Sequence, residues 1–177
     1  EMQGFFVAGP FDDGDPVTGH YYEMASDDPA RPQVWGYTAA LSYAPGESVR
    51  VSVCTNAARY DVEVIRDGLS PRTVFTRSGL EGHWRDTPED CSVTGCGWPI
   101  SFEIPVGEDW TSGGYILRTR AREEGRAEDM HEHLFIVRPR EDATRHGRLL
   151  LVAATATWTA YNDWGGSNHY QGYCGPN

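Results

Sequence analysis

Short runs of alternating apolar and polar residues, separated by turn sequences, constrain this chain more than any other feature. Residues 48–55 and 59–66 each place apolar side chains at every second position. A period of two residues is typical of strands that bury one face, so both runs are predicted to be strands. Their predicted core-facing side chains are Val49, Val51, Val53, Tyr60, Val62 and Val64. Further strands are predicted at residues 34–42, 100–104, 114–122 and 130–137.

Strands of this number and spacing predict a mainly β fold, an immunoglobulin-like β-sandwich. Aromatic residues make up 12% of the 177 residues, and 20 Gly and 11 Pro supply the turns that such a fold needs. Pro139 cannot continue a central strand, so we expect the sandwich to end there. The predicted domains are an irregular N-terminal arm (1–32), the β-sandwich (33–140), a polar linker (141–147) and the beginning of an α/β domain (148–177).

The segment 148–177 has a different pattern. Leu149 to Ala154 is a continuous apolar run, which is typical of a strand buried on both faces of a parallel sheet. An aromatic and polar loop is predicted to follow at residues 157–166, and it contains Tyr161 and Asn162. Ligands of open α/β sheets bind beyond the carboxyl ends of the strands, so we expect both side chains at such a site. Because a doubly wound sheet needs several more strands, another chain is expected to complete this domain.

The charge of the chain excludes some classes of partner. A formal net charge of −11 disfavours nucleic acid and anionic membrane surfaces, because both would repel the protein. No window of the sequence approaches the roughly 18 consecutive apolar residues of a membrane span. The first residues also lack the basic and apolar regions of a secretory signal. The expectation is a soluble, cytoplasmic protein.

Several residues allow more than one interpretation. The four cysteines are Cys54, Cys91, Cys96 and Cys174. Reduced thiols, a disulfide between Cys91 and Cys96, and a metal knuckle that also uses His83 all remain open. In the acidic, Gly- and Pro-rich arm, solvated turns are favoured over a calcium site, since the closing Glu of a calcium loop is missing.

Two further groups of side chains are candidates for binding. His131 and His133 share one face of a predicted strand, where they form either a metal-ligand pair or the solvent end of a sheet face. A long loop is predicted between Asp67 and Trp98, because no strand pattern is evident there. Trp84 and Trp98 in this loop are either anchors for a partner or part of a self-packed loop.

Five stretches of the sequence, taken in order, resemble a known family. They are residues 43–49, 60–68, 109–115, 135–139 and 157–166. The last, TWTAYNDWGG, is the most specific of them. This succession resembles the large subunit of N,N-dimethylformamidase and its relatives over about residues 33–170.

The resemblance implies an amide hydrolase in which an α/β domain follows a β-sandwich and holds a mononuclear Fe(III) ion. In the family two tyrosines and a glutamate bind the ion, and Tyr161 matches one of those tyrosines. The second tyrosine and a His-x-Glu-Tyr segment lie downstream in the family and do not occur here. We therefore expect an N-terminal fragment or subunit that cleaves the C–N bond of a small amide with metal-activated water. It would act only with a second polypeptide, as a hetero-oligomer.

The residue roles that follow from the resemblance centre on this motif. Tyr161 and Asn162 are the expected catalytic residues, and Tyr161 is also the expected metal ligand, since phenolate is a hard anion that favours Fe(III). Thr157 and Trp164 are the expected substrate-binding residues. A motif that only packs its tryptophans is the structural alternative. The alternative function is a non-catalytic β-sandwich binding or interaction module.

Overall fold

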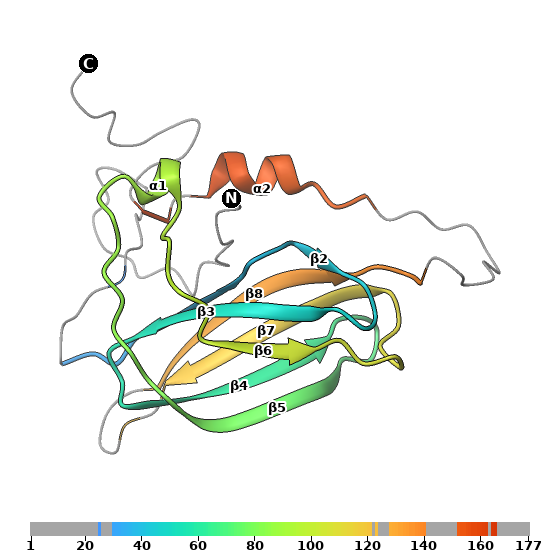
Figure 1. Ribbon diagram of the computed structural model, residues 1–177, viewed down its shortest axis with the longest axis horizontal. Helices are drawn as coiled ribbons and strands as arrows, with labels where there is room; N and C mark the ends of the chain where they lie inside the picture. Colours follow the sequence, from blue (N-terminus) through green and yellow to red (C-terminus); the bar gives the residue numbers. More distant parts are fainter. Residues whose placement is uncertain are drawn as a thin grey trace.

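The computed structural model describes residues 25, 30–121, 123, 128–140, 152–162 and 164–165 of the chain. The mainly β prediction is confirmed, since eight strands and two short helices make up the described part (Figure 1). The strands are β1 (Val34–Thr38), β2 (Ser42–Tyr43), β3 (Ser48–Thr55), β4 (Arg59–Arg66), β5 (Arg72–Glu81), β6 (Phe102–Pro105), β7 (Gly113–Ala121) and β8 (Asp129–Val137). The helices are α1 (Cys91–Thr94) and α2 (Thr155–Tyr161).

Some predictions concern residues outside this part of the chain. The irregular arm up to residue 24, with most of its acidic clusters, and the linker at 141–147 are among them. Cys174 and the beginning of the apolar run at residues 149–151 also lie outside the described residues. The division into four segments stays a prediction.

The strands form two sheets that pack face to face. One sheet has the order β1-β3-β6, and the other has the order β2-β8-β7-β4-β5. All neighbours are antiparallel except β2 and β8, which run parallel with Tyr43 opposite Val137. The short strand β2 lets the chain cross from the first sheet to the edge of the second one. The result is the predicted two-layer sandwich (Figure 1).

The core between the sheets comes from the alternating positions of the strands. Every core-facing side chain predicted from residues 48–55 and 59–66 is at most 4% exposed. Aromatic rings fill the centre: Tyr115 stacks on Trp110 with ring centroids 5.1 Å apart and on Phe135 at 5.7 Å. The Tyr115 hydroxyl donates a hydrogen bond of 2.7 Å to the carbonyl oxygen of Thr111, as in the tyrosine corner of immunoglobulin-like sandwiches.

The predicted loop between Asp67 and Trp98 is wrong in its first half. The Asp67-Gly68 turn leads into β5, which pairs with β4 over most of its length. An alternating pattern is absent because β5 is an edge strand whose two faces are both largely exposed. Its register also shifts twice against β4, which disrupts any strict period of two. The second half of the predicted loop does remain irregular, apart from α1.

The prediction for the segment around the motif is also wrong in its local structure. Residues 152–154 lie in no strand, and the predicted loop from Thr157 begins inside the helix α2. In this helix the Trp158 backbone N–H donates to the Ala154 carbonyl at 3.0 Å, and the Thr159 hydroxyl donates to the Thr155 carbonyl at 3.1 Å. A threonine hydroxyl inside a helix can bond in this way to the carbonyl four residues earlier. The segment shows no clear helical period of apolar residues, so the helix was not predicted.

A second apolar cluster lies on the outer face of the three-stranded sheet. We call it the outer cluster, and it consists of Tyr37, Cys54, Cys91, Trp98 and Trp164, flanked by Ala25, Trp35, Trp84 and Cys96. Because this cluster covers β1 and β3 from outside, both strands are buried on both faces along most of their length. The alternation of buried and exposed residues in β3 therefore ends at Ser52, and both Ser52 and Cys54 are buried although they share the outer face.

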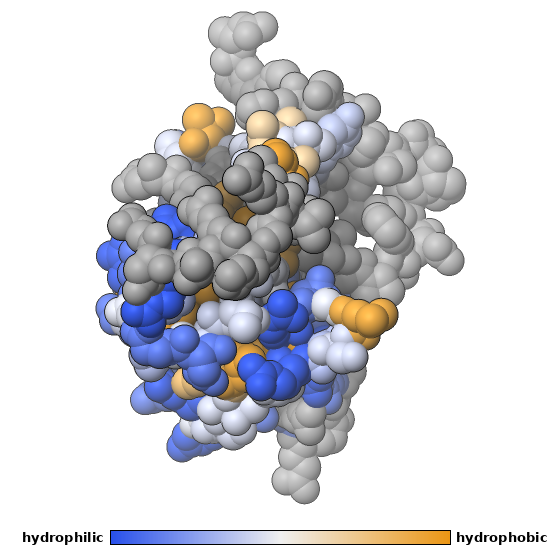
Figure 2. All heavy atoms as spheres, turned by 90° about the vertical axis from the view of Figure 1, so that its right-hand side faces the viewer, coloured by the Kyte–Doolittle hydropathy of each residue, from blue (hydrophilic) through white to orange (hydrophobic). Residues whose placement is uncertain are grey.

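The described surface is mainly hydrophilic, with a few separate apolar patches in the face that Figure 2 shows. The content of charged residues, 23% of the chain, is ordinary for a soluble domain. None of the described helices is long and apolar enough to cross a membrane.

Candidate active site

The motif residues lie in two different environments. Thr157 and Tyr161 are exposed on α2, and the side chain of Tyr161 is 63% accessible. Asn162 ends the helix and is partly buried, whereas Trp164 is 5% exposed. The four predicted site residues therefore do not share one environment: Thr157 and Tyr161 face solvent, whereas Trp164 is buried.

Trp164 is inserted into the outer cluster. Its ring meets that of Trp98 edge to face, with centroids 5.6 Å apart at 89°, and that of Trp35 with centroids 6.0 Å apart at 65°. Such edge-to-face pairs suit the charge distribution of aromatic rings. Tyr37 supports the same site, because its hydroxyl accepts a hydrogen bond of 3.2 Å from the Trp98 backbone N–H. Burial raises the pKa of Tyr37, so its hydroxyl stays protonated.

Gly165 extends this contact to α1. Its φ of 90° lies in the left-handed region, and a Cβ atom built there would lie 2.6 Å from Cys91 Sγ and 3.2 Å from the Ser92 nitrogen. A residue with a side chain would therefore meet both backbone strain and a clash. Gly165 thus packs directly on the first turn of α1. Figure 1 shows α1 and α2 on one side of the sandwich.

The cysteines of the outer cluster form no disulfide bonds. The Cys96 thiol hydrogen-bonds to Cys91 Sγ, which lowers the pKa of Cys91 and raises that of Cys96 well beyond its usual range. Burial raises the pKa of Cys54 to about 11, although its sulfur accepts a hydrogen bond from the Arg85 backbone N–H at 3.3 Å. Of the three alternatives for these residues, reduced structural thiols agree best with this geometry.

The described side chains include few candidates to bind the iron that the resemblance implies. Among residues 30–121, 128–140 and the rest of the described chain, no three His, Cys, Asp or Glu side chains gather into a metal site. This argues against the metal knuckle with His83. Tyr161 fits the role of a single ligand, because its phenol lies at the exposed C-terminal end of α2 and phenolate is a suitable donor for Fe(III). The remaining ligands would come from outside the described residues.

His131 and His133 have a different position from the one expected. They do not form the solvent end of a sheet face, since they are 5% and 1% exposed between the two sheets. His133 Nε2 lies 2.9 Å from Thr38 Oγ1, and that hydroxyl donates to the carbonyl oxygen of Ala40. The His133 ring therefore donates to Thr38. Burial, and to a smaller extent the neighbouring His133, lower the pKa of His131 to about 3.

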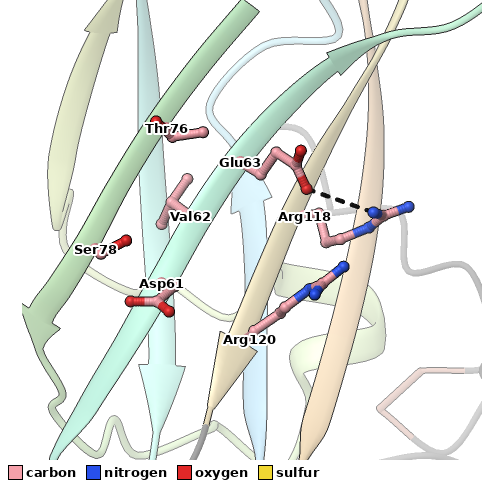
Figure 3. A pocket seen from close by; sticks show the side chains of 7 residues that line it. All are labelled: Asp61, Val62, Glu63, Thr76, Ser78, Arg118 and Arg120. Carbon is pink, nitrogen blue, oxygen red and sulfur yellow. Dashed lines mark hydrogen bonds and ion pairs between the residues drawn. The ribbon is translucent and has the colours of Figure 1, made fainter. Parts of the chain in front are cut away.

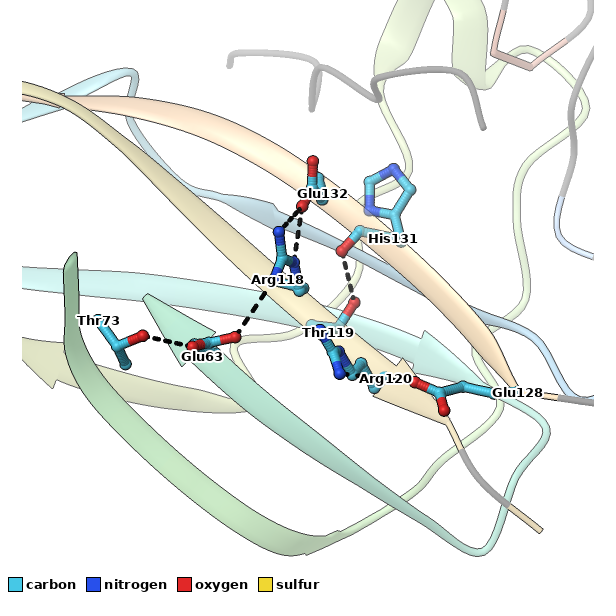
Figure 4. A network of polar contacts seen from close by, with 8 residues as sticks. All are labelled: Glu63, Thr73, Arg118, Thr119, Arg120, Glu128, His131 and Glu132. Carbon is cyan, nitrogen blue, oxygen red and sulfur yellow. Dashed lines mark hydrogen bonds and ion pairs between the residues drawn. The ribbon is translucent and has the colours of Figure 1, made fainter. Parts of the chain in front are cut away.

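A shallow groove of about 160 Å³ lies on the outer face of the five-stranded sheet (Figure 3). Its lining residues are Asp61, Val62, Glu63, Thr76, Ser78, Arg118 and Arg120. Arg118 bridges Glu63 at 3.4 Å and Glu132 at 2.6 Å across β4, β7 and β8 (Figure 4). The acidic and basic side chains of the groove thus balance one another. The ion pairs of Arg118 link three neighbouring strands, as expected of a solvated sheet face.

The interpretation of Trp98 as an exposed anchor for a partner is wrong. Its side chain is 5% exposed, since the outer cluster surrounds it. Trp84 is partly buried against the same cluster. Both tryptophans therefore follow the alternative of a self-packed segment.

Comparison with known families identifies the chain. The family model described as "N,N-dimethylformamidase beta subunit-like, C-terminal" matches residues 59–177. The chain belongs to this family. The match runs from β4 to the end of the chain and includes the whole motif on and after α2, which confirms the resemblance predicted from the sequence. No curated protein matches the sequence at a significant level.

Solved structures that resemble the chain do so weakly. The sporulation control protein Spo0M from Bacillus subtilis aligns with 13% identity and a TM-score of 0.41, over 60% of this chain and 49% of that protein. The PmoD soluble domain from Methylocystis sp. ATCC 49242 (Rockwell) aligns with 11% identity and a TM-score of 0.36, over 60% of this chain and 90% of that one. A putative superoxide reductase from Thermotoga maritima aligns with 9% identity and a TM-score of 0.35, over 67% and 95%. This chain thus spans about half the length of the Spo0M chain, and no functional argument rests on these alignments.

Membership of the family does not reveal the residues that hold the motif in place. Trp35, Trp98 and Cys91 contact Trp164 and Gly165 from positions far earlier in the chain. No periodic signal connects them to the motif. The one local signal is the glycine pair at the motif's end, since glycine is enriched where a backbone must approach closely or adopt a positive φ.

Proposed function

We propose that this chain is part of an iron-dependent amide hydrolase, in which Tyr161 provides one phenolate ligand to a mononuclear Fe(III) ion. The observation that carries the proposal is the family match over the motif, together with the exposure of the Tyr161 phenol at the end of α2. A ferric ion supplies a positive charge that polarises an amide carbonyl and makes water more acidic. The substrate class that we propose is a small amide, cleaved at its C–N bond.

The roles of the neighbouring residues follow from their geometry. The Asn162 Oδ1 atom accepts a hydrogen bond of 3.4 Å from the Trp164 backbone N–H, which orients the carboxamide. We assign its amide N–H₂ group the role of donor to the oxyanion that develops on the substrate. Thr157 lies one turn before Tyr161 on α2 and is exposed, which is compatible with a contact to substrate.

The assembly that we propose includes a second polypeptide. Its support is the family resemblance, because the second tyrosine and the His-x-Glu-Tyr segment that provide further ligands in the family do not occur among these 177 residues. Native mass spectrometry of the enzyme purified from its source is expected to find a companion chain with iron in the complex. An active, iron-containing monomer of 19.7 kDa would contradict this part of the proposal. The cytoplasm is the location that we propose, since neighbouring reduced thiols at Cys91 and Cys96 suit a reducing compartment.

Replacement of Tyr161 by Phe tests the role of the phenolate. The variant keeps the ring and removes one donor oxygen, so the iron content of the assembled enzyme should fall by about tenfold or more. Elemental analysis measures the iron, and the visible absorption of the phenolate–Fe(III) pair should disappear with it. Tyr60→Phe is the matched control, because Tyr60 is buried in the sandwich core and is 4% exposed. Equal iron in both variants would remove Tyr161 from the site.

A non-catalytic binding module is the second candidate. It is supported by the sandwich core, which is built from residues between Val34 and Val137 without any motif residue. A chain that ends at Arg140 would then fold and keep its ligand binding. The hydrolase proposal is supported instead if the shortened chain folds but its assembly does not hydrolyse amides, whereas the assembly with the full chain does.

A further inference from the structure

The segment that carries Tyr161 is attached to the sandwich by the residues that follow it. Helix α2 buries no residue, whereas Trp164 and Gly165 directly after it are both buried. The partners of Trp164 are Trp35 from β1 and Trp98 from the connection before β6. The buried part of the attachment is therefore a contact of the motif with the sandwich domain.

The fit at Gly165 is closer than an ordinary packing contact. A Cβ atom at this position would lie 2.6 Å from Cys91 Sγ, and real Cβ atoms do not approach other atoms this closely. The next neighbour is the Ser92 backbone nitrogen at 3.2 Å, which cannot rotate away as a side chain does. Trp164 and Gly165 thus form a two-point contact, with the ring in the outer cluster and the backbone on α1.

We propose that Trp164 and Gly165 are positioning residues for Tyr161. Only two residues separate Tyr161 from Trp164, so their Cα atoms, three residue steps apart, are at most about 11 Å from each other. The hydrogen bond from the Trp164 backbone N–H to Asn162 Oδ1 further restricts the conformation of the chain between Tyr161 and Trp164. The contact on the sandwich thereby limits where the Tyr161 phenol can lie while leaving its ring exposed to a ligand.

This inference assigns Trp164 a role different from the substrate contact expected from the sequence. A ring that is 5% exposed and enclosed by two other tryptophans offers little surface to a substrate. It also explains why the motif needs the sandwich, because the surface that receives Trp164 is built by β1, β3 and α1. The inference rests on the proposed function only in the choice of Tyr161 as the group that is positioned.

The variant Gly165→Ala tests the contact in the full chain. Hydrogen exchange measured by mass spectrometry should become about tenfold faster or more for the peptide that covers residues 152–162, because the segment detaches more often. Gly95→Ala is the matched control, since its φ of 83° is also positive and close to that of Gly165, but a Cβ there meets nothing within 4 Å. It should leave the exchange of this peptide at the level of the unmodified chain.

A second variant separates the clash from the backbone strain. Cys91→Ala removes the sulfur that lies nearest to the added methyl group, so the double variant Cys91→Ala/Gly165→Ala should recover part of the protection. Equal exchange in Gly165→Ala and Gly95→Ala would overturn the positioning role. So would a double variant that is no better protected than Gly165→Ala alone.

In the assembled enzyme, the same variants report on Tyr161 itself. Gly165→Ala should shift or weaken the phenolate–Fe(III) absorption, whereas Gly95→Ala should not. If Tyr161→Phe leaves iron content unchanged while Gly165→Ala accelerates exchange, the contact stands and the proposed iron ligand is wrong. If Tyr161→Phe removes iron while Gly165→Ala changes neither exchange nor absorption, the proposed function stands and the positioning role is overturned.

Discussion

The buried His131 should make the stability of the sandwich sensitive to mild acid. Its side chain is 5% exposed on β8, and its ring lies 5.1 Å from the ring of Trp35. Burial lowers the pKa of His131 to about 3, from an ordinary value of 6.5. The folded protein therefore keeps the ring neutral over a pH range in which the unfolded chain takes up a proton.

The sign of the effect follows from proton binding. Because the pKa is lower in the folded state, the contribution of His131 to stability is fully present above pH 6.5 and is lost as the pH falls from 6.5 toward about 3. Each pH unit in this window lowers the free energy of unfolding by about 1.4 kcal/mol. Between about pH 7 and about pH 4.5 the loss from this residue amounts to about 2.5 kcal/mol.

The assay is urea denaturation of the full chain at both pH values, followed by tryptophan fluorescence. Other groups also titrate in this range, so the quantity of interest is the difference between the unmodified protein and His131→Phe. This variant keeps an aromatic ring beside Trp35 and should lose about 2.5 kcal/mol less on acidification. Met130→Phe, on the same strand but 47% exposed, is the control and should keep the original pH dependence. The same acid-induced loss in both variants would refute a buried, neutral His131.

Three further outcomes are expected. Tyr115→Phe leaves the Thr111 carbonyl without its 2.7 Å hydrogen bond and should lower the free energy of unfolding by about 1 kcal/mol, as measured in urea; an unchanged value would mean that water replaces the hydroxyl. Arg118→Met should lower it by about 1 kcal/mol or less, because the ion pairs of Arg118 are partly exposed and screened, and a larger loss would show that the network on this sheet face is more than a solvated surface. Cys54 should resist alkylation by iodoacetamide near neutral pH in the folded protein and react in urea, because burial raises its pKa to about 11 and encloses it; rapid labelling of the native chain, detected by peptide mass spectrometry, would contradict this.

Much of the sandwich was predictable because strands with one buried face carry their own pattern. The predicted bounds of β3 and β4 are those of the structure, the predicted strand at β7 is shifted by one residue at both ends, and the one at β8 begins one residue late. The strand β5 was missed, since it lies at a sheet edge where neither face is consistently buried. Local alternation predicts strands only where tertiary burial is one-sided.

The candidate site was predictable only in part. The string around Tyr161 points to the family from its residues alone, and the family match confirms that assignment. The helix α2 and the burial of His131 and His133 were not predicted. For the two histidines, the sequence shows a shared face but does not show how deep between the sheets that face lies.

The sequence by itself determined which residues alternate, where turns interrupt them, and which family the motif belongs to. These properties depend on residues that are neighbours along the chain, so short stretches of the sequence are sufficient to predict them. Only the tertiary structure decided that Trp164 packs against Trp35 and Trp98 and that Gly165 lies on Cys91. Such contacts join residues that are distant along the chain, and they depend on the shape of the surface that the folded sheets and α1 create together. No local pattern in the sequence predicts the shape of that surface.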